Sequence, residues 1–375
     1  MLVLAIALII VAAILRDLFK FATADGDFTL ISKGKARREE IEDKVFWITG
    51  ASRGIGEVLA KQLASLGAKL ILSARSEKEL ERPFAFAFLM LASFDIGKHA
   101  PDGVEILPLD LASGEESLKE AVDKAESFFS GSGVDYMVHN AAYERPKASA
   151  LESTEGNLKA TFDVNVLGTI SNQASGAFNV EERERSFCCV ASFLQMSSAA
   201  GKTPAPGQAI YSASKYAING YFHSLRSELY RKGIKVTVVC PGPIDTSNSS
   251  TASTPEMKRR ISSERCAELT LVAATHGLKE AWISDQNSQV ELPKPPRTEH
   301  LSMATPTKAE CFFPFLYWYY GERVQPVLAI MYLVQYMPTV GYWIMDKVGG
   351  NRVEAATQKG NTYSWKLLFG HKKTA

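Results

Sequence analysis

A tyrosine and a lysine four residues apart, Tyr211 and Lys215, have the types and spacing needed for proton transfer. Residues at this spacing share one face of a helix, and apolar residues recur near the helical period across 208–230. A free phenol has a pKa of about 10, and a neighbouring ammonium lowers it by stabilising the phenolate. Tyr211 could therefore give a proton to a carbonyl oxygen, or accept one from an alcohol.

Ser198 could act on the same oxygen. It precedes this predicted helix and follows a run that is predicted to form a strand, so its hydroxyl could donate a hydrogen bond to the reacting group. The alternative is an amphipathic helix with an incidental tyrosine, because Tyr and Lys at this spacing are common by chance.

A glycine-rich turn opens the globular part of the chain. The apolar run 45–49 leads into GASRGIG at 50–56, and 57–66 has helical apolar spacing. This context suits a dinucleotide pyrophosphate, because glycines let the backbone approach phosphate and a helix N-terminus supplies free N–H groups. An ordinary strand-to-helix turn is the alternative. No Gly-Lys-Ser/Thr follows, which excludes a nucleotide-triphosphate P-loop.

Two arginines favour NADPH over NADH as the cofactor. Arg75 follows the next predicted strand, 69–74, at the place where NAD sites carry a carboxylate for the ribose hydroxyls. Arg53 lies in the glycine turn. Both guanidinium groups could pair with a 2′-phosphate, and the alternative is that each is a solvated surface charge.

Further β-rich runs end in turn or polar residues. They are 104–109, 134–138 and 235–240. Strands alternating with helical stretches predict an α/β fold, a single doubly wound Rossmann domain with a parallel sheet. Ligands of such sheets bind at the carboxyl ends of the strands.

Residues from about 42 to 285 resemble the short-chain dehydrogenase/reductase family, because they contain a set of motifs in the order typical of that family. The motifs are TGASRGIG at 49–56, HNAA at 139–142, VNVLG at 164–168, Ser198, YSASK at 211–215 and PGPIDT at 241–246. The resemblance implies an NAD(P)-dependent enzyme acting on a carbonyl or alcohol, with Asn165, Ser198, Tyr211 and Lys215 as catalytic residues. Asn165 would hold a water in the proton relay to Lys215, and Lys215 would also bind the nicotinamide ribose.

The resemblance also implies a set of cofactor-binding residues along the carboxyl edge. They are Thr49, Gly50, Ser52, Arg53, Gly54, Ile55, Gly56, Arg75, Asp110, Leu111, Asn140, Ala141, Tyr211, Lys215, Pro241, Gly242, Ile244 and Thr246. Asp110 would lie by the adenine and Asn140 would border the cofactor. Ala142 stands where the family usually has glycine, a small departure.

Segments outside these motifs resemble a narrower, membrane-associated branch of the family. They are 24–30, 278–286 and 333–339. That branch belongs to the endoplasmic reticulum and is linked to steroid and retinoid carbonyls. It implies a hydrophobic carbonyl or alcohol as substrate and membrane lipid as a partner, and a homodimer is a further option.

Charge and cysteine usage exclude other classes. The 375 residues carry a formal net charge of +1, which gives no electrostatic reason to expect nucleic acid. The five cysteines show neither CxxC pairs nor metal-ligand spacing, so no metal site is predicted. We interpret them as free thiols in a reducing compartment.

The N-terminal segment 1–22 is interpreted as a membrane anchor. Residues 1–15 carry no charge, and they span roughly 22 Å as a helix, against a hydrocarbon core of ~30 Å. Extension to residue 22, with Arg16 and Lys20 reaching the interface, could close that gap. A signal peptide would have a basic start, and a surface-packed core helix would not be apolar all round. The basic residues after 15 predict a catalytic domain on the cytosolic side of the endoplasmic-reticulum membrane.

The chain is thus divided into an anchor at 1–22, a linker at 23–43, the Rossmann domain at 44–286, an atypical insertion at 287–324 and an apolar extension with a polar tail at 325–375. The uncharged part of the extension, 324–345, suits either a membrane interface or a helix packed over the substrate mouth.

Two further stretches depart from the family pattern. Residues 83–95 are expected to interrupt the charged helix begun at Ser76, and 172–193 to replace most of the helix after Asn165 and the start of the strand before Ser198. An alternative or mispredicted gene model is one explanation of these stretches and of 287–324. Because a damaged strand would misplace Ser198, a catalytically silent NADPH-binding or scaffold protein is the alternative function.

Overall fold

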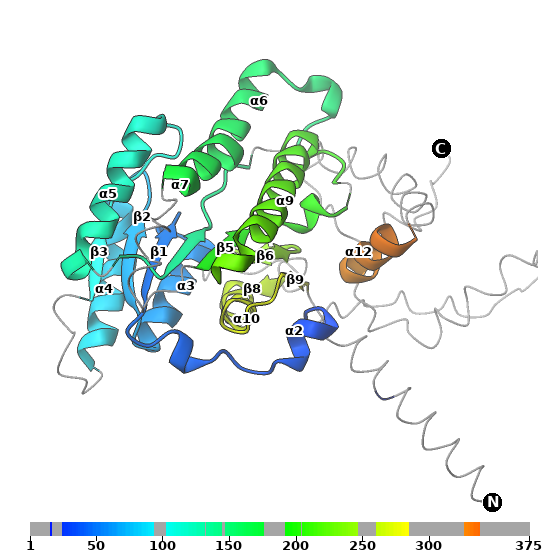
Figure 1. The fold of residues 1–375 in the computed structure, drawn as a ribbon. Helices are drawn as coiled ribbons and strands as arrows, with labels where there is room; N and C mark the ends of the chain where they lie inside the picture. Colours follow the sequence, from blue (N-terminus) through cyan, green and yellow to red (C-terminus); the bar gives the residue numbers. More distant parts are fainter. Residues whose placement is uncertain are drawn as a thin grey trace, which may run out of the picture.

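The structure is a computed structural model that describes residues 16, 25–93, 103–131, 133–144, 147–175, 192–203, 205–246, 260–284 and 326–337. Its centre is a seven-stranded, entirely parallel sheet in the order β3-β2-β1-β4-β5-β6-β9 (Figure 1). The strands are β1 (Val45–Thr49), β2 (Lys69–Ser73), β3 (Val104–Ile106), β4 (Tyr136–His139), β5 (Ser192–Met196), β6 (Lys235–Pro241) and β9 (Glu280–Ile283). The order reverses between β1 and β4, which creates the crevice where doubly wound sheets bind nucleotides. The predicted α/β Rossmann fold with a parallel sheet is therefore confirmed.

The strands are buried on both faces because helices cover both sides of the sheet. All five residues of β1 are buried. Alternate side chains point to opposite faces, so Phe46 and Ile48 join one core cluster while Val45 and Trp47 join the other.

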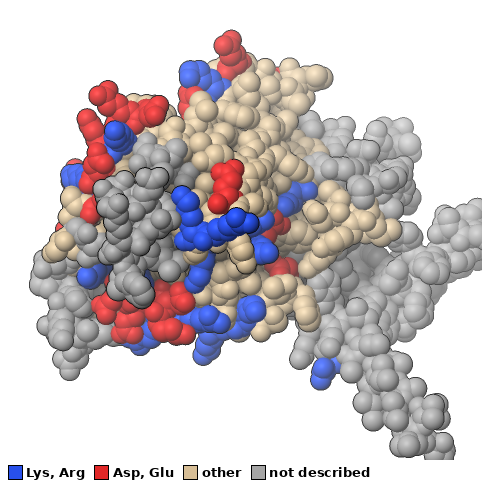
Figure 2. Space-filling view, in the orientation of Figure 1, with Lys and Arg blue, Asp and Glu red and all other residues tan. Residues whose placement is uncertain are grey.

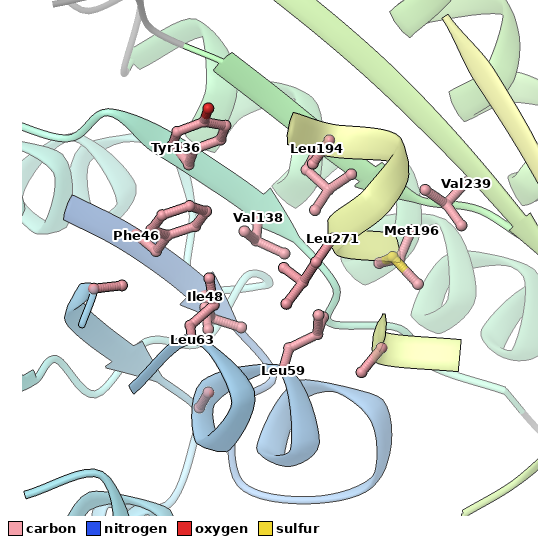
Figure 3. Close-up of a cluster of buried hydrophobic side chains, with 14 of the residues drawn as sticks. Phe46, Ile48, Leu59, Leu63, Tyr136, Val138, Leu194, Met196, Val239 and Leu271 are labelled. Atoms are coloured by element: carbon pink, nitrogen blue, oxygen red, sulfur yellow. The ribbon is translucent and has the colours of Figure 1, made fainter. Parts of the chain in front are cut away.

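Two layers of helices enclose the sheet (Figure 1). The side of Phe46 and Ile48 is covered by α3 (Gly54–Ser65), α4 (Glu77–Ser93) and α10 (Ser263–Thr275). Figure 3 shows the part of this core in which Leu59 and Leu63 of α3 and Leu271 of α10 pack on the strands. The side of Val45 and Trp47 is covered by α5 (Glu115–Gly131) and α9 (Ala209–Leu229). Beside them on that side run α6 (Glu155–Phe162), the π-helix η3 (Asp163–Gly168) and α7 (Thr169–Ser175). The remaining short elements are η2 (Ala150–Glu152), η4 (Ala199–Gly201), η5 (Tyr230–Lys232), β7 (Ile244–Asp245) and β8 (Ile261–Ser262).

An N-terminal arm with α2 (Phe28–Ser32) and η1 (Arg38–Glu40) packs directly onto this domain. The arm pairs with the end of β9: the Asp27 N–H donates to the Trp282 carbonyl over 2.9 Å, and the Trp282 N–H donates to Asp27 Oδ2 over 2.7 Å. Leu30 and Ile41 are completely buried. The described part of the sequence assigned to a linker, from residue 25 on, is thus attached to the domain through a few buried residues, while most of its side chains are exposed.

Residues 83–95 are expected from the sequence to interrupt a helix. This prediction is wrong for residues 83–93, because α4 runs through Pro83 and continues to Ser93. Proline removes one backbone hydrogen bond, but Leu80, Phe84 and Ala87 recur at helical spacing and pack into the core. This burial holds the helix together across the proline. Residues 94 and 95 lie outside the described part of the chain.

The expected damage around 172–193 is smaller than the sequence suggests. Helix α7 continues to Ser175, and β5 begins at Ser192 and pairs along its whole length with β6. An intact strand therefore leads to Ser198. Residues 176–191 lie outside the described part.

The anchor predicted at 1–22 lies outside the described residues, apart from Arg16, and so do the insertion at 287–324 and most of 325–375. Of the extension, the structure describes α12 (Pro326–Tyr336) and Met337. No helix within the described ranges is long and apolar enough to cross a membrane.

Candidate active site

The glycine turn between β1 and α3 is folded tightly on itself. Gly50 has a left-handed backbone (φ +67°), and a Cβ there would lie 2.8 Å from the Ala141 Cα. A Cβ at Gly56 would lie 2.3 Å from the Gly50 carbonyl oxygen and 2.5 Å from Asn140 Nδ2. Neither position has room for a side chain, so the turn presents bare backbone at the N-terminus of α3.

Thr49 and Asn140 lock this turn to the end of β4. The Thr49 hydroxyl donates to the Val138 carbonyl over 3.2 Å and accepts from the Asn140 and Ala141 N–H groups at 3.1 and 3.2 Å. Asn140 Nδ2 donates to the carbonyls of both Thr49 and Gly50 at 3.1 Å. The two strand ends at the crevice are therefore held as one unit.

The PGPIDT segment after β6 faces the same turn. A Cβ at Gly54 would lie 3.5 Å from Thr246 Cβ, so this residue borders the start of α3. The Gly242 N–H donates to the Ile283 carbonyl over 2.7 Å, and Ile244 pairs with Ile261 in the small β7-β8 sheet. These bonds hold residues 242–246 at the carboxyl edge of the sheet, next to the glycine turn. Pro241, the first residue of the motif, is the last residue of β6 and is buried.

The two arginines are exposed at the turns after β1 and β2. Neither Arg53 nor Arg75 makes an ion pair or a side-chain hydrogen bond with a described residue. Ser52, by contrast, is buried, and its hydroxyl donates to Glu79 over 3.3 Å. The bare cradle suits a dinucleotide pyrophosphate, and the two free guanidinium groups suit an additional phosphate on its ribose.

Asp110 and Leu111 follow β3, which is the outermost strand of the sheet on the side of β1 and β2. Asp110 is exposed and its Oδ1 accepts from the Ala112 N–H over 3.0 Å, while Leu111 is buried. Gly168 packs against this turn so closely that a Cβ would lie 2.0 Å from the Leu111 carbonyl oxygen. Helix η3 is thereby seated beside the predicted adenine end.

Tyr211 and Lys215 lie on one face of α9. Lys215 Nζ is 5.6 Å from the centre of the Tyr211 ring and donates to the Met196 carbonyl at the end of β5 over 2.9 Å. Burial lowers the pKa of Lys215 to about 8 from its ordinary 10.5. A buried ammonium beside a phenol is an arrangement that can stabilise a phenolate.

Ser198 follows β5 in an extended conformation and caps η4. Its Oγ accepts from the Ala200 N–H over 3.1 Å. An Oγ that accepts this bond keeps its own proton available for donation to a substrate oxygen.

Asn165 is buried within the π-helix η3, a type of turn that is frequent at functional sites. Its Oδ1 accepts from the Tyr143 N–H over 2.7 Å, and its Nδ2 donates at 3.0 Å to the Tyr143 carbonyl and to Ser214 Oγ. Ser214 Oγ in turn donates to the Tyr211 carbonyl over 2.7 Å. Asn165 is thus joined to α9 through Ser214.

Sequence reasoning missed Tyr143 and Ser214. The place of Ser214 three residues after Tyr211, on the same helical face, is a signal that could have found it. Tyr143 bonds to Asn165 through its backbone N–H and carbonyl, and the identity of a side chain gives no signal for such backbone bonds.

Comparisons with known proteins match the chain to one family. A model of the short chain dehydrogenase family matches residues 44–257. The chain is 30% identical over 355 residues to Dehydrogenase/reductase SDR family member 7 of Homo sapiens, covering 91% of this chain and 89% of that protein. The Mus musculus protein of that name is 31% identical over 354 residues, with the same coverage.

Solved structures share the fold. An alcohol dehydrogenase of the archaeon Thermococcus sibiricus, complexed with 5-hydroxy-NADP, is 24% identical, with a TM-score of 0.54 over 65% of this chain and 97% of that one. A short chain dehydrogenase/reductase family protein superposes with a TM-score of 0.53 at 23% identity, over the same shares of the two chains.

Proposed function

The chain belongs to the short-chain dehydrogenase family and is an oxidoreductase of that family, and we propose that it is a membrane-associated, NADPH-dependent enzyme. It reduces the carbonyl, or oxidises the alcohol, of a hydrophobic substrate such as a steroid, a retinoid or another lipid-like compound. The observation that carries this proposal is the position of Lys215, which lies beside the Tyr211 ring and bonds to the Met196 carbonyl, two residues before Ser198. The bare glycine turn lies at the same carboxyl edge of the sheet.

NADPH would supply the hydride when bound. The backbone of 50–56, Asn140, Ala141 and the segment 241–246 would hold it, since they border the crevice. Tyr211 donates the proton to the substrate oxygen, and Ser198 donates a hydrogen bond to that oxygen. The Lys215 ammonium stabilises the phenolate that Tyr211 leaves behind.

The preference for NADPH over NADH is supported by Arg53 and Arg75. Both are exposed and unpaired among the described residues, at the turns after β1 and β2. No carboxylate directly follows β2, where an NAD site would place one. NADH is the weaker cofactor in this proposal.

Membrane association is supported by exposed apolar side chains on α2 and α12. Phe28 of α2 is 62% exposed and Tyr336 of α12 is 73% exposed. Trp282 contacts both helices: its N–H bonds to Asp27 at the start of α2, and its ring packs against Tyr332 of α12 at 4.9 Å between ring centres. On the face seen in Figure 2, uncharged side chains form the surface at α12. The described part of the N-terminal arm therefore lies beside the apolar surface of α12.

Deletion of residues 1–22 tests the anchor. The truncated protein is expected to leave carbonate-washed membranes at least in part, and wholly retained protein would assign attachment to 324–345 instead. The proposed location is the endoplasmic-reticulum membrane with the domain in the cytosol. Asn248-Ser249-Ser250 is an acceptor sequence for lumenal glycosylation. Glycosidase-sensitive mobility that depends on Asn248 would overturn that orientation.

A homodimer is a further part of the proposal. Leu158, Leu167 and Tyr216 expose large apolar side chains on α6, η3 and α9, elements that pack against one another. Light scattering of detergent-solubilised protein after size exclusion is expected to give twice the chain mass.

The direct test of function is an NADPH-oxidation screen of purified protein against steroid, retinoid and small aromatic carbonyls. We expect carbonyl-dependent oxidation with at least one class. NADPH binding without oxidation by any of them would favour the second candidate, a catalytically silent binding or scaffold protein. The intact β5 that leads to Ser198 favours the enzyme.

A further inference from the structure

The short turn η4 carries Ser198 at its start and is held at its other end by two side chains with no assigned role. We propose that Asn219 and Glu280 are positioning residues that fix this turn and thereby hold the Ser198 hydroxyl in place relative to Tyr211. The proposal rests on the proposed function, in which Ser198 donates to the substrate oxygen.

Asn219 joins the turn to the catalytic helix. It lies one helical turn after Lys215 on α9 and is buried. Its Nδ2 donates to the Gly201 carbonyl over 2.8 Å. Because a carbonyl oxygen only accepts, the amide nitrogen must face it. This is the one hydrogen bond that the Asn219 side chain makes with the described residues.

The backbone of the turn lies directly on α9 at this point. A Cβ at Gly201 would lie 2.8 Å from Asn219 Nδ2 and 3.0 Å from the Lys215 carbonyl oxygen. Ser198 Oγ is bonded to the N–H of Ala200, the residue before Gly201. A displacement of Gly201 would therefore reach the Ser198 hydroxyl through a single residue.

Glu280 holds the next residue of the turn. Its Oε2 accepts from Lys202 Nζ over 2.7 Å and from His223 Nε2 over 2.6 Å, and its Oε1 accepts from Trp282 Nε1. These bonds join the end of η4, the middle of α9 and the first residue of β9.

The protonation of this cluster follows from its contacts. Arg226 Nη1 donates to His223 Nδ1 over 2.7 Å, so the proton of a neutral imidazole lies on Nε2 and points at Glu280. Burial raises the pKa of Glu280, but the bonds from His223, Lys202 and Trp282 outweigh it and lower the pKa to about 2. The carboxylate is therefore charged at every working pH.

The turn is thus fixed at two consecutive residues, Gly201 by α9 and Lys202 by β9. Small displacements of a positioned group can lower a rate roughly 100-fold. Holding the turn in this way fits the need to keep Ser198 and Tyr211 aimed at one substrate oxygen.

A double-mutant cycle tests the role of Asn219. In the wild-type background, Asn219→Ala is expected to lower kcat roughly 10-fold while KM and the Kd for NADPH stay within about two-fold. In a Ser198→Ala background, Asn219→Ala should not lower kcat any further, because the Ser198 hydroxyl that Asn219 positions is absent. An equal loss in both backgrounds would show that Asn219 does not act through Ser198.

Glu280→Gln gives a second variant that keeps the size of the side chain. It should lower kcat while leaving NADPH affinity intact. The matched control is Glu268→Gln, which removes an exposed carboxylate paired with Arg265 on α10 and should leave kcat unchanged. Equal behaviour of the two variants would contradict a positioning role for Glu280.

Hydrogen exchange of the peptide 197–203 separates this proposal from the proposed function. Asn219→Ala should speed amide exchange in that peptide and leave the β1 peptide 45–49 unchanged, whether or not the enzyme turns over a given carbonyl. Absence of turnover by the wild type would refute the proposed function alone. Unchanged exchange at 197–203 would overturn the positioning role.

Discussion

The two sides of the central sheet are built from the same strands but carry different kinds of residues. On the side covered by α3 and α10, Figure 3 shows an apolar core that includes Ile48, Leu63 and Leu194. On the side covered by α9, neighbouring strands bring polar His139 and Gln195 beneath the helix that carries Lys215 and Asn219.

This difference in residue type suggests that one side of the sheet mainly stabilises the fold and that the other side carries the catalytic residues. Buried polar groups cost free energy unless they are satisfied, and the α9 side places Lys215 and Asn219 in the buried layer next to the carboxyl edge. On the other side, the buried polar residues Glu57, Thr270 and Thr275 are all hydrogen-bonded within the helices of that layer, and apolar side chains fill the space between those helices and the sheet. Changes at the site residues of α9 should therefore alter catalysis more than folding, and changes in the apolar core on the α3 side should do the reverse.

The largest effect is expected for Tyr211→Phe on the α9 side. Loss of the phenol proton should lower kcat about 10³-fold, within the range of general acid catalysis. NADPH affinity should change little, because the glycine turn and the arginines lie on other elements. Steady-state NADPH oxidation and a fluorescence titration measure the two quantities. Undiminished turnover would refute the mechanism.

Leu63→Ala on the α3 side should instead lower the free energy of unfolding by about 2–5 kcal/mol, because it leaves a cavity among buried side chains. Urea denaturation measures this loss, and kcat per folded molecule should be unchanged. Leu151 is 97% exposed, so Leu151→Ala is the control and should leave stability nearly unaltered. A kcat that fell with Leu63→Ala would contradict the separation of the two sides.

Arg75→Asp tests the cofactor preference at the end of β2. We expect the Kd for NADPH to rise about 10-fold, since an exposed charge-assisted bond is lost and a like charge is introduced, while the Kd for NADH changes less. Arg231→Asp, at an exposed arginine of η5, is the control. Equal affinity of the wild type for NADH and NADPH would argue against the role of both arginines.

The smallest effect concerns His139, whose buried ring lies 5.4 Å from that of Phe222. Burial lowers the pKa of His139 to about 3 from its ordinary 6.5. An unfolded histidine binds a proton below pH 6.5 while the folded one does not, so the stability contribution is complete above pH 6.5 and is lost as the pH falls towards 3.

The loss should approach about 1.4 kcal/mol per pH unit within that window. His139→Leu should remove this component. The fall in unfolding free energy between pH 6.5 and pH 5.5 should then be about 1 kcal/mol smaller in the variant than in the wild type. Identical falls in the two proteins would contradict a neutral, buried His139.

The parts of the site that are local in sequence could be predicted from it. The run 45–49 before the glycines predicts a buried strand and a phosphate cradle, and the spacing of Tyr211 and Lys215 predicts a shared helical face. Each of these patterns depends on residues within a few positions of one another, where spacing determines geometry.

Contacts between distant segments could not be predicted in this way. The bond from Asn219 to Gly201 and the ion pair of Glu280 with Lys202 depend on how β9 and α9 are placed. The continuation of α4 through Pro83 depends on core contacts of the residues that follow it. Tertiary packing decides such features, and local pattern does not report it.

The central claim is hydride transfer from NADPH to a carbonyl, completed by a proton from Tyr211. In the most direct test, the full-length enzyme is incubated with a carbonyl identified in the screen and with NADPH that is deuterated at the transferable C4 position. The mass of the alcohol product is then measured by mass spectrometry. The account predicts one deuterium per product molecule with the wild type and no alcohol above background with Tyr211→Phe. Unlabelled alcohol from the wild type, or labelled alcohol in equal yield from Tyr211→Phe, would contradict it.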